Sequence, residues 1–342
     1  MPWVPRISVH HGWPESCSSL ASTPYGQQMP TVTDTEPFST PPGSRILAVI
    51  NPASGDADPS GPDPVMELLS RRLDERGVQV QRIPFEPDGL AGALSEALDE
   101  QVSAICVAGG DGTLLGVVEA LDGRRVPLGI VPRGTMNWMA KDLGIPLDLE
   151  AAVETLLDAR VRYVDTARVN GAPFLCACMI GVSPLVARQR ERERGSAPWS
   201  RWPRLVWQGL RLLRLYPHRR MRLIADGRSR RLRSHTVVVT NNLLETASGP
   251  LPRRTHLDAG RLGIYAVRKT SARDLIRLLT RVMLGDWLAD DAVLTTAASE
   301  ASLGVSGRRA ISLMLDGEIR RLETPLRFSV EPRSVAMLVP AT

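Results

Sequence analysis

Short apolar segments alternate with amphipathic ones between Arg45 and Arg162, and this alternation constrains the fold more than any other feature of the chain. The apolar segments are typical of buried strands, and they cover residues 45–50, 78–83, 103–110 and 126–132. Segments with the apolar spacing of helices follow them, at residues 65–73, 89–100, 114–121 and 136–143. Strands that alternate with helices predict a parallel sheet with right-handed crossovers. Residues 45–162 are therefore predicted to form an α/β domain.

The pattern changes after about Arg162. Residues 163–181, 220–242 and 260–269 show the alternation and the glycine turns of antiparallel strands, and helices are expected near 184–216 and 271–288. Residues 163–342 are therefore predicted to form a second, mostly β domain. A return of the C-terminal end of the chain to the first domain is left open. Residues 1–44 are rich in Pro, Ser and Thr and lack the apolar core of a secretory signal, so we expect a disordered tail.

Three turns rich in small residues follow the first, third and fourth predicted strands. They read NPASG from Asn51, GGDGT from Gly109 and PRGTMN from Pro132. Because the carboxyl ends of parallel strands meet at one edge of a sheet, the three turns can converge on one polyphosphate. Taken singly, each turn could also be a strand-to-helix connection with a Ser, Thr or Asn cap.

Several common catalytic motifs are absent from the sequence. The only lysines are Lys141 and Lys269, and neither follows a glycine, so there is no P-loop. The glycine turn also departs from the dinucleotide pattern, because the third glycine is displaced to Gly116. No zinc-protease HExxH motif and no hydrolase GxSxG motif occurs. These absences argue against a dinucleotide oxidoreductase, a P-loop kinase, a zinc protease and an α/β-hydrolase.

The three turns, together with LDGE at Leu315–Glu318, resemble the diacylglycerol kinase catalytic-domain family, which includes bacterial lipid kinases, sphingosine kinases and ceramide kinases. The resemblance runs from about Arg45 to Pro340. The GGDGT turn alone is shared with NAD kinases, whereas PRGTMN and LDGE select the lipid branch. The resemblance implies an α/β nucleotide-binding domain joined to a β-sandwich-like lipid-substrate domain, with the active site between them.

The resemblance also implies the residues of the site. Glu318 is predicted to accept the proton of the lipid hydroxyl, with Asp316 in support; if the segment is extended, both side chains point to the same side. A hairpin turn at Asp316-Gly317 is the alternative. Asp111 and Asp165 are predicted to hold Mg²⁺, which would explain a carboxylate within a phosphate-binding turn. The residues expected to bind ATP are Asn51, Ser54, Gly55, Gly109, Gly110, Asp111, Gly112, Thr113, Gly134, Thr135 and Asn137.

Three positions depart from the family pattern. Trp138 and Met139 replace the Asp-Phe of the family's Asn-Asp-Phe-Ala segment, and Pro84 replaces a nucleotide-contacting Thr. Ala259 replaces the second aspartate of the family's LDDG segment, which argues against a second, structural metal. Two alternatives to an ATP- and Mg²⁺-dependent lipid kinase stay open: an NAD kinase, and an inactive protein that binds nucleotide or lipid.

Positive charge is concentrated in one part of the chain. Fifteen arginines and three acidic residues lie between Arg188 and Arg233, in a chain of net charge +5. Residues 199–213 place tryptophans and aliphatic residues on one helical stripe with arginines beside it. This pattern predicts peripheral contact of segment 199–222 with an anionic membrane, and a core-facing helix is the alternative. We expect no nucleic-acid partner and a cytoplasmic protein at the inner face of the membrane; a homodimer is left open.

Overall fold

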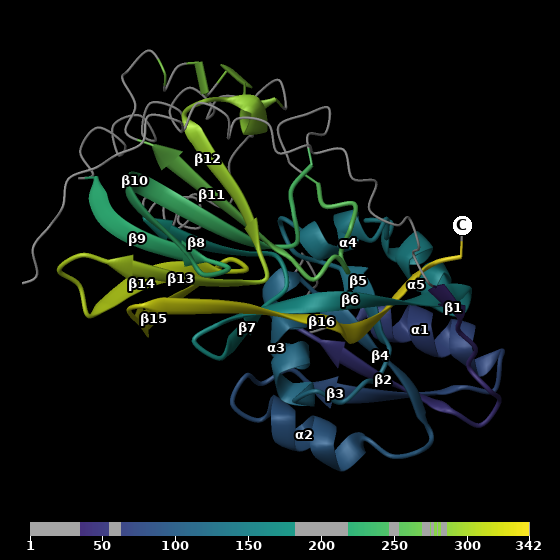
Figure 1. Cartoon of the computed structure of the whole chain (residues 1–342). Helices are drawn as coiled ribbons and strands as arrows, with labels where there is room; N and C mark the ends of the chain where they lie inside the picture. Colours follow the sequence, from purple (N-terminus) through teal and green to yellow (C-terminus); the bar gives the residue numbers. More distant parts are fainter. Residues whose placement is uncertain are drawn as a thin grey trace, which may run out of the picture. The chain divides into compact units, whose positions relative to one another are not determined.

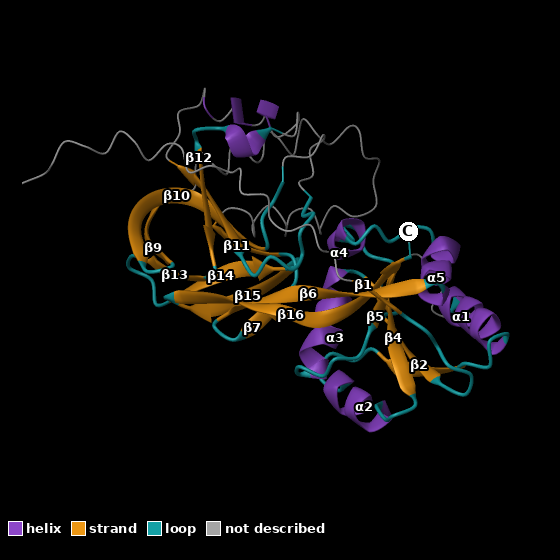
Figure 2. Cartoon of the chain, turned by 45° about the vertical axis from the view of Figure 1, so that its right-hand side comes forward, coloured by secondary structure: helices purple, strands orange, loops and turns teal. Residues whose placement is uncertain are grey.

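The computed structural model describes residues 35–54, 63–181, 218–245, 253–268 and 286–341, together with residues 274, 277, 278, 280 and 281. The predicted parallel sheet is present in the first part of the chain (Figures 1 and 2). Its strands lie in the order β5, β4, β2, β3. They are β2 (Arg45–Ile50), β3 (Gln79–Pro84), β4 (Val102–Gly109) and β5 (Leu128–Pro132). All three pairings are parallel, so the carboxyl ends of these strands meet at one edge.

Helices connect these strands and cover the sheet. They are α1 (Pro64–Asp74), α2 (Leu90–Ala97), α3 (Asp111–Leu121), α4 (Trp138–Asp142) and α5 (Leu149–Leu157). The predicted helix at 136–143 is therefore shorter than expected, and α5 was not predicted. Asp63 and Asp148 cap α1 and α5 with side-chain hydrogen bonds, which satisfy amides that the first turn leaves unpaired.

The second part is mostly antiparallel. β8 (Ala177–Gly181), β9 (Arg219–Ala225), β11 (Leu262–Arg268) and the long β10 (Arg228–Asn241) pair with one another through β10. A short 3-10 helix, η1 (Trp287–Ala289), precedes the remaining strands. These are β12 (Val293–Ala298), β13 (Glu300–Val305), β14 (Ala310–Leu315) and β15 (Glu318–Glu323). The predicted helix at 184–216 lies outside the described residues.

Two long strands join the two parts. β6 (Ala159–Val169) leads into the short β7 (Ala172–Phe174), and β16 (Leu326–Pro340) pairs with β6 along most of its length. β16 also pairs with β13 at one end and, in parallel, with β5 at the other. The C-terminal strand therefore returns to the α/β part, and β6 and β16 cross the boundary predicted near residue 162 (Figure 1).

The predicted N-terminal tail was too long. β1 (Thr35–Pro37) pairs antiparallel with β6, and the amide of Phe38 donates to the carbonyl of Ala159. Residues 35–44 are therefore part of the fold, whereas residues 1–34 lie outside the described residues. Among the helices that the structure describes, none is long and apolar enough to cross a membrane.

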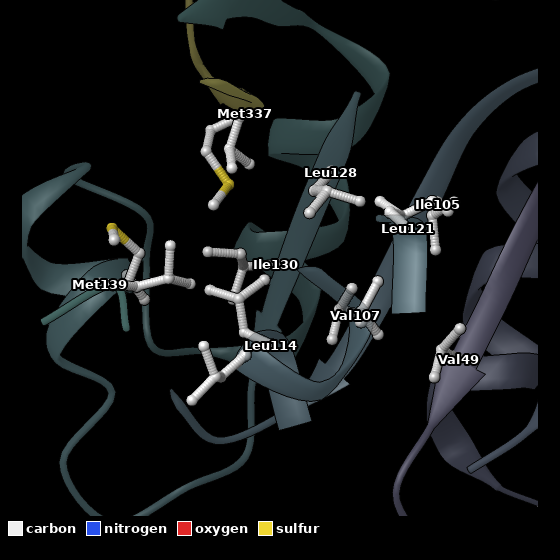
Figure 3. Close-up of a cluster of buried hydrophobic side chains, with 14 of the residues drawn as sticks. Val49, Ile105, Val107, Leu114, Leu121, Leu128, Ile130, Met139 and Met337 are labelled. Atoms are coloured by element: carbon white, nitrogen blue, oxygen red, sulfur yellow. The ribbon is translucent and has the colours of Figure 1, made fainter. Parts of the chain in front are cut away.

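A continuous apolar core fixes the geometry of the sheet edge. Figure 3 shows Leu114 of α3, Ile130 of β5 and Met139 of α4 pointing toward one another, with Met337 of β16 above them. These side chains are almost fully buried. α3 and α4, which begin at the predicted turns, are thus held on the end of the parallel sheet by ordinary packing.

One buried ion pair crosses between the two parts. The Arg254 Nε atom lies 2.7 Å from a carboxylate oxygen of Asp142 in α4, and neither side chain has measurable exposure. The other end of the guanidinium donates to the carbonyls of Leu175 and Asn241 at 2.6 and 2.9 Å. It also lies 5.3 Å from the ring centre of Trp138. α4 is therefore bound to the segment between β7 and β8 through Arg254.

Removing one partner of this pair leaves a buried charge without compensation. We expect Arg254→Met to lower the free energy of unfolding by about 3–5 kcal/mol. Asp142→Leu combined with Arg254→Met should recover much of the loss, because the double variant buries no charge. Urea unfolding measures both. Arg253→Met, at the exposed neighbouring position, is the control, and an equal loss in that variant would contradict the assignment.

Candidate active site

Three predicted turns and the LDGE segment line one cleft of about 670 Å³. The turns follow β2, β4 and β5 at the carboxyl edge of the parallel sheet, and the LDGE segment comes from the β14–β15 hairpin. Most of the predicted site residues are brought together here, namely Asn51, Ser54, Gly110, Asp111, Gly112, Thr113, Gly134, Thr135, Asp316 and Glu318. Gly109 and Asn137 do not line the cleft themselves, although Asn137 is hydrogen-bonded to Gly134, which does. Gly55 lies outside the described residues.

The turns after β4 and β5 touch through their glycines. A Cβ atom on Gly134 would lie 2.6 Å from the Cα atom of Gly110, and one on Gly109 would lie 2.5 Å from the side chain of Thr113. Such distances are far too short for a larger residue, so the two turns approach each other only because both carry glycine.

Amide side chains hold the turns in shape. The Asn51 Nδ2 atom donates to the Thr113 hydroxyl at 2.9 Å and ties the first turn to the second. Asn137, in the left-handed region at φ 46°, exchanges two hydrogen bonds with the backbone of Gly134 at 2.8 and 2.9 Å. Thr135 is exposed at the cleft surface. The side-chain hydrogen bonds of Asn51 and Asn137 therefore stabilise the conformation of the turns.

Asp111 holds two of the turns together. Its two carboxylate oxygens accept hydrogen bonds from the amides of Trp138 and Met139, each at 3.0 Å. These amides are at the N-terminus of α4, where no helical carbonyl is available to them. The carboxylate in the glycine turn thus has a structural role, because it binds the first amides of α4, the helix that follows the turn after β5.

Asp316 lies in a hairpin turn and not in an extended segment. Asp316 and Gly317 both have positive φ, at 45° and 99°, and connect β14 to β15 as the two central residues of the turn. The Asp316 carboxylate accepts the amides of Leu175, Cys176 and Ala177 at 2.6–2.9 Å. Burial raises the pKa of Asp316 to about 6, against the lowering effect of these amides. The segment is therefore the hairpin turn and not the extended one, so Asp316 and Glu318 do not point to the same side of a strand.

Glu318 is the exposed carboxylate of the cleft. It is the first residue of β15, its side chain is 54% exposed, and a Cβ atom on Gly112 would lie 3.4 Å from its Oε1 atom. Arg320 lies 3.4 Å from its Oε2 atom and makes shorter contacts of 2.9 and 3.3 Å with Glu119 of α3. The predicted base therefore lies against the GGDGT turn, with a free oxygen toward the cleft.

Asp165 does not join this group. It is fully buried in β6, and its two oxygens accept the amides of Gly260 and Arg333 at 2.7 and 2.8 Å. Burial raises its pKa. It is absent from the lining of the cleft that contains Asp111. The structure thus does not bring the two predicted metal ligands together, and Asp165 ties the turn at Gly260 to β16.

Arg320 and Arg133 line the cleft but were not predicted. Arg320 comes two residues after Glu318, so the alternation of a strand places both side chains on one face, and this signal could have found it. Arg133 pairs with Asp63, the cap of α1, at 3.0 Å, and both side chains are 10% exposed. No local sequence pattern predicts this ion pair, because 69 residues lie between Asp63 and Arg133 in the sequence.

Asp111 supplies the cleft with a carboxylate suited to a nucleotide-bound metal. Among the described residues, no three His, Cys, Asp or Glu side chains form a cluster that could hold an ion alone. Mg²⁺ in phosphate-transferring proteins needs no such cluster, because one or two carboxylates and the substrate phosphates supply its ligands. Asp111 faces the cleft and fits that role, whereas Asp165 does not.

Comparison with known proteins agrees with this geometry. A model of the diacylglycerol kinase catalytic domain matches residues 45–169, and one of the YegS C-terminal NAD kinase beta sandwich-like domain matches residues 179–339. A diacylglycerol kinase of Mycobacterium tuberculosis is 28% identical over 305 residues, which are 86% of this chain and 95% of that protein. A YegS-like lipid kinase of Klebsiella pneumoniae is 34% identical over 111 residues, 32% of this chain and 37% of that protein.

A solved structure shows the same fold. The crystal structure of a diacylglycerol kinase from Bacillus anthracis matches with a TM-score of 0.65 at 21% identity, covering 87% of this chain and 98% of that one. The two matched models together span both parts of the chain, in the order that the fold requires. The chain belongs to the diacylglycerol kinase catalytic-domain family, a family of ATP-dependent lipid kinases.

Proposed function

We propose that the chain transfers the γ-phosphate of ATP to a hydroxyl group of diacylglycerol, a sphingoid base or a related lipid. One observation carries the proposal: Glu318, an exposed carboxylate, lies against the GGDGT turn in the cleft that the three turns share. A base and a phosphate-binding backbone are thus adjacent, which is the arrangement that phosphoryl transfer to an alcohol needs.

Each group has a role in this reaction. The backbone at Gly110, Gly112 and Gly134 receives the phosphates, and Asp111 faces them with the carboxylate that Mg²⁺ needs. When bound, Mg²⁺ neutralises phosphate charge. Glu318 accepts the hydroxyl proton while the lipid oxygen forms its bond to the γ-phosphorus and the bond to the ADP oxygen breaks. Arg320 holds Glu318 in place.

Transfer of labelled phosphate from ATP to a panel of lipids in mixed micelles tests the proposal. The panel contains diacylglycerol and sphingoid bases, with NAD⁺ as a competing acceptor. Label on one lipid class supports the proposal and names the acceptor. Label on NAD⁺ alone would make the chain an NAD kinase, and bound ATP without any transfer would make it an inactive nucleotide-binding protein.

Glu318→Gln removes the proposed base but keeps the shape of the side chain. We expect kcat to fall by a factor on the order of 10² to 10⁴, with ATP affinity unchanged. Steady-state kinetics and a nucleotide-binding titration separate the two quantities. Glu323→Gln, an exposed position at the other end of β15, is the matched control. Unchanged kcat in Glu318→Gln would rule out its role as the base.

Asp111→Asn is expected to weaken the apparent affinity for Mg²⁺ by a factor on the order of 10 to 100, because a neutral amide is a poorer partner for the ion. The dependence of activity on Mg²⁺ concentration measures this shift. Asp148→Asn removes the same charge from another helix cap and should leave the Mg²⁺ response unchanged. A purely capping role for Asp111 would lower stability without moving the Mg²⁺ response.

The pKa of Asp316 predicts how stability depends on pH. Between about pH 4 and pH 6 the folded protein keeps a proton on Asp316 that the unfolded chain has released, because burial raises this pKa from 3.8 to about 6. This group therefore stabilises the fold most at low pH, and the contribution is lost as pH rises through 6. The free energy of unfolding of wild type should fall, relative to Asp316→Asn, by roughly 2 kcal/mol between pH 4 and pH 6 and by roughly 3 kcal/mol over the whole transition from about pH 3 to pH 7.

Urea unfolding of both proteins at several pH values measures this difference. Asp122→Asn, at an exposed turn position that also has positive φ, is the control and should show no such trend. A constant difference between wild type and Asp316→Asn would mean that the three amides hold the pKa of Asp316 near its ordinary value.

A further inference from the structure

The hairpin of β9 and β10 has one face that packs on the core and one basic face; Arg230 of β10 stands in register with Leu223 on the core side. Met221, Leu223 and Ala225 of β9 are buried in the core of the β-rich part. Arg220 and Arg222 alternate with them and are exposed, as the period of a strand requires. The hairpin is therefore anchored by one face, and the opposite face is exposed.

Like charges stand directly opposite each other on the exposed face. Arg220 is paired in register with Arg233 of β10, and Arg222 with Arg231. These four residues are called the arginine surface below. On the far side of β9, the neighbours in β13 are small: Gly304 stands beside Arg222. Directly opposed like charges destabilise a sheet, so the fold carries this pattern at a cost in stability.

Carboxylates do not offset these charges. In the part of the chain that the structure describes, none of the four arginines forms an ion pair, and Arg222 donates instead to the Ser229 hydroxyl at 3.0 Å. The only acidic residue in the hairpin is Asp226, in its turn, and Asp226 pairs with Arg261. The surface therefore carries positive charge that no other described side chain neutralises.

A hollow next to this surface extends the basic area. Its volume is about 370 Å³, and Arg230, Arg231, Arg233 and Arg268 line it. It forms where the pairing of β10 with β11 shifts register between Ser234 and Val237, as β10 turns from β9 toward β8. Figure 1 shows β9 and β10 diverging from β11 in this way. The hollow has room for an anionic group larger than a single ion.

We propose that the arginine surface and this hollow bind the anionic headgroups of a lipid membrane. The exposed face of a hairpin spreads its charges over a broad area, so several headgroups can be engaged at once. A single-stranded nucleic acid is disfavoured, because residues 219–234 contain no aromatic side chain on which bases could stack. The inference does not depend on the phosphotransfer proposed above, since binding and catalysis are measured separately.

Edge protection is the other physical reason for charges on this hairpin. β10 pairs with β9 alone between Arg228 and Arg233, and charged residues on such an edge prevent pairing with another chain. That purpose requires a few charges of either sign. It does not require four arginines in two opposed pairs, nor the basic hollow beside them.

Sedimentation with lipid vesicles tests the proposal on the full chain. Vesicles of phosphatidylcholine alone are compared with vesicles of equal parts phosphatidylcholine and phosphatidylglycerol, at low and high salt. We expect binding only to the anionic vesicles, and loss of binding as salt rises. Because each arginine near such a surface contributes roughly fivefold in affinity, changing all four to Gln should weaken binding by roughly 600-fold.

Two further variants distinguish charge at these four positions from the net charge of the protein. A variant with Lys at the same four positions keeps the charge and the edge protection, and it should bind the anionic vesicles. Arg71, Arg82, Arg124 and Arg125 are exposed in the α/β part, and changing them to Gln removes the same net charge. This control should bind like wild type. Urea unfolding should show the surface Gln variant to be as stable as wild type or more stable, because opposed like charges are gone.

Three results would overturn the proposal. Equal binding of wild type and the surface Gln variant would place the lipid contact elsewhere. Equal binding of the surface and control Gln variants, both weakened, would mean that net charge alone is responsible. Tighter binding of wild type to a DNA duplex than to anionic vesicles, lost in the surface Gln variant, would assign the surface to nucleic acid.

Discussion

The position of Glu318 depends on one short segment, Leu175–Ala177, whose backbone is bound from both sides. The Asp316 carboxylate accepts its three successive amides, and the buried Arg254 guanidinium donates to the carbonyl of Leu175. Because Glu318 is two residues from Asp316 in a tight hairpin, any shift of this segment moves the proposed base. Backbone groups have a fixed geometry, so this arrangement holds the base more rigidly than side-chain contacts alone.

The same segment links the two parts of the cleft. Arg254 connects it to Asp142 in α4, and the N-terminus of α4 is bound to Asp111 in the glycine turn. Charge-assisted hydrogen bonds, joined by the backbone of α4 and of Leu175, thus connect Asp111 to Asp316. Replacement of a member of this path acts at both ends, and additive effects of substitutions are not expected within it.

Most of the cleft could be predicted from the sequence, because parallel strands bring successive turns to one edge whatever else surrounds them. The positions of Gly110, Thr113 and Gly134 at this edge follow from that rule, whereas the order of the strands does not. Contacts between residues far apart in sequence could not be predicted. The Asp316-Gly317 pair illustrates this: it is an ordinary hairpin turn by its backbone, and only the distant segment Leu175–Ala177 gives the Asp316 carboxylate its partners.

The departure from the family at Trp138 has a physical explanation in these contacts. Asp111 recognises the amide of Trp138, not its side chain, so the contact with the glycine turn survives a change of residue type. The indole lies instead beside the Arg254 guanidinium, at 5.3 Å. Asp142, one helical turn further on, supplies the carboxylate for that guanidinium. Trp138 and Asp142 therefore act as one unit with Arg254, and the aspartate that the family carries at position 138 would face the same cation from one turn earlier in α4.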